Sequence, residues 1–291
     1  MQLYLTIDVC LLANVFENFR ATCHETYELD PTYFVSAPQL AWNAMFKKTK
    51  LEVKLLSDPE MYRMIQPNIR GGICHASIRC VWANNKYLDA LYDPTQEDSY
   101  ILYIDANNLY GWAMSQALPK DNYAWLSEAE VREAERALTS NNRATRLGFF
   151  DMSARACREL ARAVNAELNG VLPDPPIEEI DFSMQYILKV DLEYPREIHD
   201  RDDDYPLAPE VMEIKTEMVS AKHLQLRRKY YGAATPYSRK LVCSLLPKNK
   251  YVIHSENLKF YLERGMKVTK VHRGIMFLTG YYLKVFSLLL V

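Results

Sequence analysis

One carboxylate, Asp105, has the sequence context of a metal ligand in a phosphoryl-transfer site. The run before it, residues 100–104 (YILYI), is aromatic and β-branched, which favours a buried strand over a helix of only five residues. A strand end would hold the carboxylate rigidly, and Mg²⁺ beside a triphosphate needs such hard oxygen ligands. Tyr110 would then lie near the sugar of a nucleotide, where its ring can exclude a 2′-hydroxyl. On spacing alone, an ordinary turn or N-cap role for Asp105 stays open.

Two further segments have residue types that suit a phosphate backbone. In Arg70-Gly71-Gly72, the glycines let backbone amides approach a phosphate and the guanidinium can pair with it, although a flexible turn explains the same residues. Residues 222–250 are basic and contain tyrosines, so they could follow a template strand, or simply form a solvated charged face.

A rival pair of carboxylates, Asp191 and Glu193, lies in an alternating segment. Because apolar residues occupy every second position, we expect residues 188–194 to form a half-buried strand with Asp191 and Glu193 on its solvated face. We therefore do not assign them a catalytic role.

The elements around these segments follow from periodicity and capping signals. Helices are predicted at 8–19, after the Ser-Ala-Pro entry within 32–45, within 57–64, from the capping box at 127–130 and at 257–263. Strands are predicted at 251–253 and 267–277, and residues 68–73 are a breaker. The Ala- and Arg-rich stretch before Asn169-Gly170 predicts a further helix, followed by a proline hinge at 173–176.

Composition restricts the class of protein. With 291 residues, 49% of them hydrophobic, the chain can bury a sizeable core. It has 35 basic and 37 acidic residues, so any nucleic-acid contact must be local. The six cysteines form no CxxC pair, which indicates reduced thiols. Because no apolar run is long enough for a membrane span and no secretory leader is evident, we expect an intracellular protein with no membrane partner.

The string DANNLYGWAMSQALP, which starts at Asp105, resembles the first palm motif of family B DNA polymerases, Asp-x-x-Ser-Leu-Tyr-Pro. Asn108 replaces the usual Ser, and Gly111 replaces the Pro. The whole string is similar to the organellar and viral branch, which includes protein-primed enzymes and Maverick-like mobile elements. The resemblance implies that Asp105 is the catalytic metal ligand. It also implies nucleotide contacts at Ala106, Asn108, Leu109 and Tyr110.

Two other strings resemble motifs of the same family, in the expected order. Tyr4 and Asp8 match Tyr-x-x-x-Asp, the third exonuclease motif, and their spacing of four places them on one face of a helix. A tyrosine packed beside an N-terminal Asp remains the alternative. Arg70-Gly71-Gly72 resembles the Tyr-x-Gly-Gly linker, which implies DNA binding there, although Ile69 stands where the tyrosine is usual.

The resemblance implies an α+β fold built as the front half of a polymerase palm, preceded by a remnant of an RNase H-like 3′-5′ exonuclease domain. We expect the remnant at residues 1–66 and the partial palm at 67–291, with an atypical segment at about 139–180. The second metal carboxylate of the family comes from an Asp-Thr-Asp hairpin, and the triphosphate lysine from a Lys-x-x-x-Asn-Ser-x-Tyr-Gly helix; neither string occurs here. We therefore expect an internal piece of such an enzyme, ending in an aberrant apolar tail.

The expected function is template-directed DNA synthesis by two-metal nucleotidyl transfer, with Mg²⁺ or Mn²⁺ held only if missing segments complete the site. The expected partners are a DNA template-primer, deoxynucleoside triphosphates and, by resemblance alone, a terminal priming protein. With one carboxylate, the isolated chain is expected to turn over poorly. A noncatalytic DNA-binding relic is the alternative. A metal-dependent nuclease using Asp8 is the third hypothesis.

Overall fold

The computed structural model describes residues 2–50, 53–78, 80–150, 184–232 and 239–283, and they form an α+β fold. The helices are α1 (Gln2–Tyr27), α2 (Ala37–Thr49), α3 (Pro59–Ile65), α4 (Leu109–Met114), α5 (Glu128–Leu138), α7 (His199–Asp202), α8 (Ala221–Tyr231) and α9 (Ser255–Glu263). The strands are β1 (Leu118–Trp125), β2 (Met184–Glu193), β3 (Glu210–Glu213), β4 (Arg239–Val242), β5 (Lys248–His254) and β6 (Lys267–Gly280). Residues 143–150 are also helical. The helix and hinge predicted within 151–183 lie outside the described residues.

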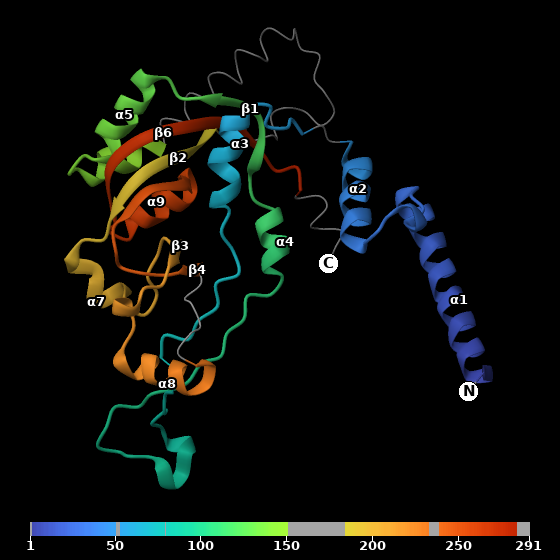
Figure 1. Cartoon of the computed structure of the whole chain (residues 1–291), viewed down its shortest axis with the longest axis horizontal. Coiled ribbons are helices and arrows are strands. Elements are labelled where there is room, and N and C mark those ends of the chain that lie inside the picture. The colour runs from blue at the N-terminus through green and yellow to red at the C-terminus, as the bar shows by residue number, and fades with distance from the viewer. Residues whose placement is uncertain (1, 51–52, 79, 151–183, 233–238, 284–291) are drawn as a thin grey trace.

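A four-stranded antiparallel sheet in the order β1-β6-β2-β5 forms the centre of the molecule (Figure 1). The alternation predicted for residues 188–194 is confirmed, because Leu188, Val190 and Leu192 are almost fully buried within β2. These side chains all project from the same face of the sheet, since side chains alternate along a strand. The predicted strands at 251–253 and 267–277 lie within β5 and β6.

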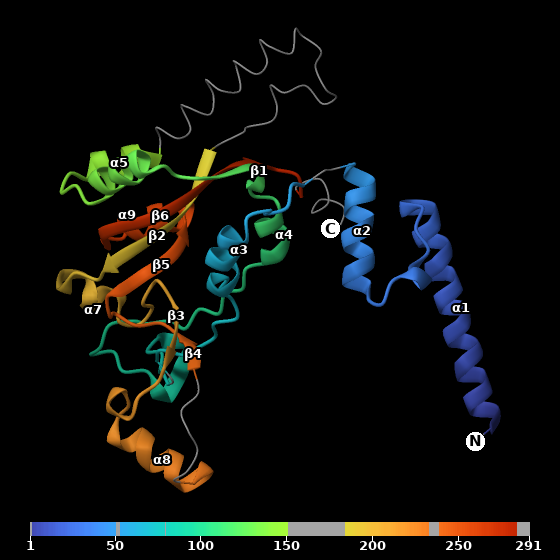
Figure 2. The same cartoon turned by 45° about the horizontal axis from the view of Figure 1, so that its top comes forward.

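Helices cover both faces of this sheet. On one face, Leu138 of α5 and Leu258 and Leu262 of α9 pack against the buried side chains of β2. On the other face, Met61 and Met64 of α3 pack against Val252 of β5 and Ile275 of β6. In both views α3 and α5 lie on opposite sides of the sheet (Figures 1 and 2). The sheet is therefore a buried layer between helices, and the described residues of its core lie within 56–65, 123–150, 184–208 and 245–276.

Local capping signals account for where several helices begin. Ser36 caps α2 and is followed by a proline in the first turn, as the Ser-Ala-Pro entry predicts. At α5, the hydroxyl of Ser127 accepts from the amide of Glu130, and the Glu130 carboxylate accepts from the amide of Ser127. This is the reciprocal arrangement of a capping box. Asp58 caps α3 through a 2.7 Å hydrogen bond from the amide of Glu60.

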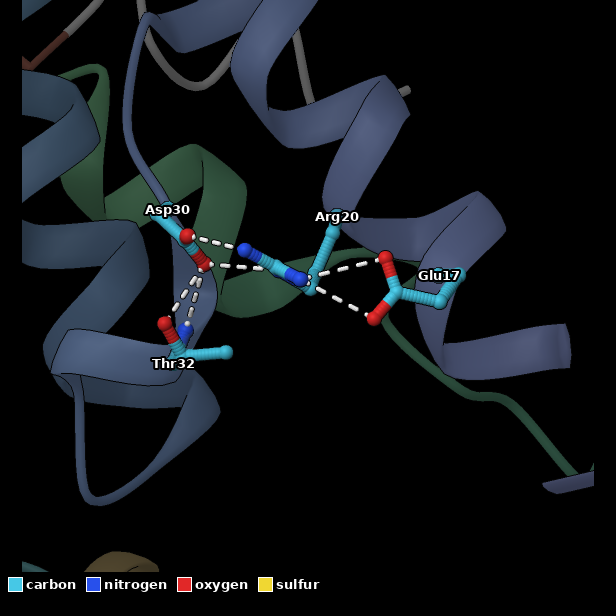
Figure 3. Close-up of polar contacts among 4 residues, drawn as sticks. All are labelled: Glu17, Arg20, Asp30 and Thr32. Atoms are coloured by element: carbon cyan, nitrogen blue, oxygen red, sulfur yellow. Dashed lines mark hydrogen bonds and ion pairs between the residues drawn. The ribbon is translucent and has the colours of Figure 1, made fainter. Parts of the chain in front are cut away.

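An ion-pair cluster fixes the turn between α1 and α2 (Figure 3). Arg20 donates from Nη2 and Nε to the two carboxylate oxygens of Asp30, at 2.6 and 3.1 Å, and from Nη1 to Glu17. Asp30 also accepts from the amide and hydroxyl of Thr32. These hydrogen bonds, led by the one from Arg20, hold the pKa of Asp30 well below its usual range.

Helix α1 contains the predicted segment 8–19 but buries little of it. Its apolar side chains from Leu3 to Phe19 are exposed, and within the described part of α1 only Cys23 is buried. The prediction of a helix is confirmed, whereas the packed apolar face that amphipathic spacing indicated is not found among the described residues.

The strand predicted at residues 100–104 is wrong. These residues have no regular secondary structure, and all five side chains are exposed, from 60% for Tyr100 to 93% for Tyr103. A strand persists only when another strand pairs with its backbone, and the described sheets have no partner beside this run. The apolar, β-branched composition of residues 100–104 favours a strand, but it does not provide a partner strand.

Candidate functional site

Asp105 lies in the exposed segment that leads into α4, three residues before the helix cap. Because residues 100–104 are not a strand, the expected delivery of this carboxylate by a rigid strand end is also wrong. Asp105 makes no hydrogen bond or ion pair within the part of the chain that the structure describes. A helix follows soon after Asp105, since α4 begins at Leu109.

Asn108 and Gly111, the two departures from the family motif, are coupled in space. Asn108 adopts the left-handed conformation, with φ of 49°, and its Oδ1 accepts from the amide of Gly111 at 3.1 Å. A Cβ atom added at position 111 would lie 2.4 Å from Nδ2 of Asn108, closer than nonbonded atoms approach. Asparagine tolerates this conformation, and a proline at 111 would have no amide to donate. The pair therefore forms a cap that replaces the usual Ser and Pro.

The predicted nucleotide-contacting residues lie around the start of α4. Leu109 and Tyr110 are the first residues of the helix and are 57% and 88% exposed. Ala106 lies in the exposed segment before it. A planar ring that is this accessible can meet a ligand, but no described side chain packs behind it to fix its orientation. The segment presents these exposed residues together at the start of α4.

Tyr4 and Asp8 lie on α1, where their spacing of four places them on one helix face, as expected. Both are exposed. In both views α2 lies between α1 and α4 (Figures 1 and 2). The structure therefore does not bring Tyr4 and Asp8 together with Asp105.

Arg70 packs on the central sheet. Its guanidinium carbon lies 3.8 Å from the centroid of the Tyr251 ring, and Nη1 donates to the carbonyl of Val252 at 2.9 Å. Gly71 and Gly72 follow in an exposed segment; Gly72 has φ of 73°, and a Cβ on either glycine would meet nothing within 4 Å. The breaker predicted at 68–73 is thus an open turn in which Arg70 contacts β5.

An open hollow of about 340 Å³ lies beside this contact. It is bordered by Asn68, Arg70, Tyr251 and His254, with apolar side chains between them. Burial lowers the pKa of His254 to about 4 and raises that of Tyr251. Both groups are therefore neutral near pH 7. Arg70 supplies the formal positive charge among the residues that border the hollow. Asp105 is not among the residues that line this hollow.

Asp191 is more constrained than a solvated strand face suggested. Its Oδ1 accepts from the amide of Lys250 at 2.6 Å and lies 2.8 Å from Nε2 of His272. Burial acts to raise the pKa of Asp191, but these hydrogen bonds outweigh it and the pKa lies below the usual range. No sequence signal pointed to this cluster, because its members are 59 and 81 residues from Asp191. It joins three strands and contacts no other predicted site residue.

The described residues do not fit a two-metal centre. Within them, no three His, Cys, Asp or Glu side chains gather closely enough to hold a metal ion. A single exposed carboxylate such as Asp105 offers one ligand, whereas Mg²⁺ bound through protein and phosphate needs a fixed octahedral arrangement. We therefore derive no chemical step through a metal from this geometry.

Comparison with protein-family models places the sequence. Residues 2–166, more than half of the chain, match the model described as DNA polymerase type B, organellar and viral. The chain belongs to this family. The matched region of this type B polymerase contains Tyr4, Asp8, the Arg70 linker and the whole Asp105 motif. Comparisons with curated proteins and with solved structures found no match.

Family membership gives the general activity: type B DNA polymerases are nucleotidyltransferases that use a DNA template-primer, deoxynucleoside triphosphates and, generally, divalent metals. The central sheet of this polymerase lies mostly beyond the matched residues, because β2 and β5 follow residue 166. In the described part of the chain, no helix has both the length and the apolar character that a membrane crossing needs.

Proposed function

We propose that this chain contributes to template-directed DNA synthesis, with Asp105 as a metal-binding carboxylate and Tyr110 beside the sugar of the incoming nucleotide. The observation behind the proposal is the family match, which includes the complete Asp105 to Gly111 motif. The cap formed by Asn108 and Gly111 supports it, because it gives the motif a defined local structure at the start of α4.

We further propose that residues 1–66 derive from an exonuclease domain and residues 67–291 from a palm. Among the described residues, only helices precede Arg70 and every strand follows it, while α3 packs on the central sheet. In this assignment Tyr4 and Asp8 are an exonuclease motif without partner carboxylates. The finer placement in the branch of protein-primed and Maverick-like enzymes rests on the DANNLYGWAMSQALP string and brings a terminal priming protein as a proposed partner.

A second function, binding DNA without catalysis, is favoured by one observation. The described residues gather no metal-ligand set, so Asp105 alone would have to position the ion. Such a relic would retain contacts to DNA, which we propose at Arg70, Gly71 and Gly72, but would not extend a primer.

Primer extension separates the two functions. The full chain is incubated with a labelled primer-template, deoxynucleoside triphosphates and either Mg²⁺ or Mn²⁺, beside Asp105→Asn and the matched control Asp98→Asn. Synthesis predicts weak extension that Asp105→Asn abolishes and Asp98→Asn retains, because Asp98 is an exposed carboxylate of the same segment. Extension that survives Asp105→Asn contradicts the assigned role. DNA binding without extension by any variant favours the relic.

A further inference from the structure

The connection between β3 and β4 contains a basic helix that projects away from the central sheet. β3 and β4 pair as a two-stranded antiparallel sheet, in the register Glu210↔Val242 to Glu213↔Arg239, and α8 lies in the chain between them. In both views α8 lies beyond this pair of strands, on the side away from α5 (Figures 1 and 2). We call β3, α8 and β4 the arm.

The arm is basic from α8 onward, whereas β3 at its start contains Glu210 and Glu213. Between Glu217 and Glu256 the sequence has no acidic residue, whereas the chain as a whole has a net charge of −2. The basic residues of this stretch differ in how exposed they are. Lys248 is buried, Arg227 is half-buried, and the others in the described part are exposed: Lys222, Arg228, Lys229, Arg239, Lys240 and Lys250.

Lys248 anchors the arm and is not part of its charged surface. Its side chain is 0% exposed, and Nζ donates to Oε1 of Glu210 and to Oγ of Ser244, both at 2.6 Å. The hydroxyl of Tyr251 donates to the carbonyl of Pro209, just before β3. The base of the arm is therefore fixed to β5 by buried polar contacts.

Two lysines on one face of α8 have a spacing that suits the regularly spaced phosphates of a nucleic-acid backbone. Lys222 and Lys229 are seven residues apart, 20° short of two helical turns, so they share one face at a separation of about 10 Å. This is about three base-pair rises of 3.4 Å. Arg228 is beside them, and these three cations make no ion pair among the described residues. Tyr230 is 66% exposed, and Nζ of Lys229 lies 5.2 Å from its ring.

From these observations we infer that the arm is a binding site for the phosphate backbone of a nucleic acid, separate from the Asp105 motif. Unpaired cations at backbone spacing release counterions when they meet phosphates, and an exposed aromatic ring beside them can stack on a base. That the nucleic acid is DNA rests on the proposed function. Contacts to the backbone alone would hold the nucleic acid without reading its sequence.

Binding of the full chain to labelled DNA, measured by fluorescence anisotropy in EDTA over a range of salt, tests this inference without requiring catalysis. The arm variant is Lys222→Gln/Arg228→Gln/Lys229→Gln. The matched control, Arg196→Gln/Lys267→Gln/Lys270→Gln, removes three exposed cations from another surface. We expect the arm variant to bind about tenfold or more weakly at low salt, with a slope of log K against log salt about 2 to 3 smaller. The control should bind like wild type.

Three outcomes overturn the site. They are absence of DNA binding by wild type, equal losses in the arm variant and the control, and competition by polyglutamate as strong as that by DNA. The conservative variant Lys222→Arg/Lys229→Arg must retain binding, and circular dichroism must show that the arm variant is folded. Salt-dependent binding through the arm together with failed primer extension would retain the arm and reject synthesis.

Discussion

The guanidinium of Arg70 stacks on the ring of Tyr251, with 3.8 Å between the guanidinium carbon and the ring centroid. The same side chain donates to the carbonyl of Val252. Val252 lies on β5, an outer strand of the central sheet, and this carbonyl would otherwise lack a strand partner. Arg70 therefore links the turn after α3 to the sheet. Any DNA contact by Arg70 has to use the remaining N–H groups of a guanidinium that is already held in place.

Arg70→Gln is expected to destabilise the fold. It removes a cation–π contact and a hydrogen bond to a charged donor, which together are worth about 1–3 kcal/mol in unfolding free energy. Urea unfolding followed by circular dichroism measures the loss. Arg63→Gln, which breaks an exposed pair with Glu60 in the same region, should cost less than about 0.5 kcal/mol. Equal stability of the two variants would show that the stacked contact contributes nothing.

The buried ion pair between Lys248 and Glu210 should respond asymmetrically to substitution. The Lys248 side chain is 0% exposed, whereas that of Glu210 is 28% exposed and can be hydrated. Glu210→Gln leaves a buried ammonium without its counter-charge, at a cost of about 3–5 kcal/mol. Lys248→Met leaves a carboxylate that water reaches and fills the space with an apolar chain, so we expect a smaller loss. Urea midpoints in the opposite order would contradict this account.

Local signals in the sequence predicted a large part of the secondary structure. The Ser36 entry and the Ser127 capping box mark helix starts through contacts that span only a few residues, and both are found. The alternation in β2 succeeded for the same reason, since one buried face specifies it. Each of these signals is complete within a short window of the chain.

The sequence did not predict which elements pack against one another. The run at 100–104 has strand composition but no partner, so the strand and the geometry expected for Asp105 fail together. Conversely, Trp125 donates from Nε1 to Asp58 at 2.6 Å across 67 residues, a contact that no local pattern predicts. The motif at Asp105 was visible from residue identity alone, whereas its surroundings depend on long-range packing.

Gly274 in β6 should tolerate no side chain. A Cβ atom there would lie 2.5 Å from Cδ1 of Leu126 and 2.7 Å from Cδ2 of Leu188, both of which are buried. Gly274→Ala therefore forces the core to shift, at about 1–3 kcal/mol in unfolding free energy. Gly148→Ala is the matched control: its Cβ would meet nothing within 4 Å, and it lies in the helical residues 143–150. There alanine should be neutral or stabilising by up to about 1 kcal/mol.

His254 gives the protein a specific sensitivity to acid. Its Nδ1 accepts from the amide of Glu256 and so caps α9, which requires an imidazole unprotonated at that nitrogen. Burial lowers its pKa to about 4, from the usual value near 6.5. As pH falls below about 6.5, the unfolded chain binds a proton that the folded chain refuses until about pH 4. The unfolding free energy should therefore fall over this window, by on the order of 2–3 kcal/mol.

His254→Asn tests this directly, because asparagine is a good N-cap that does not titrate. Unfolding free energies from urea titrations at pH 7 and 4.5 should differ less in this variant than in wild type, since the histidine contribution is gone while the carboxylates remain. His223→Asn removes an exposed imidazole from α8 and should retain the wild-type difference. If His254→Asn keeps the full wild-type pH dependence, the buried imidazole is not its source and the acid sensitivity must come from carboxylates such as Asp30.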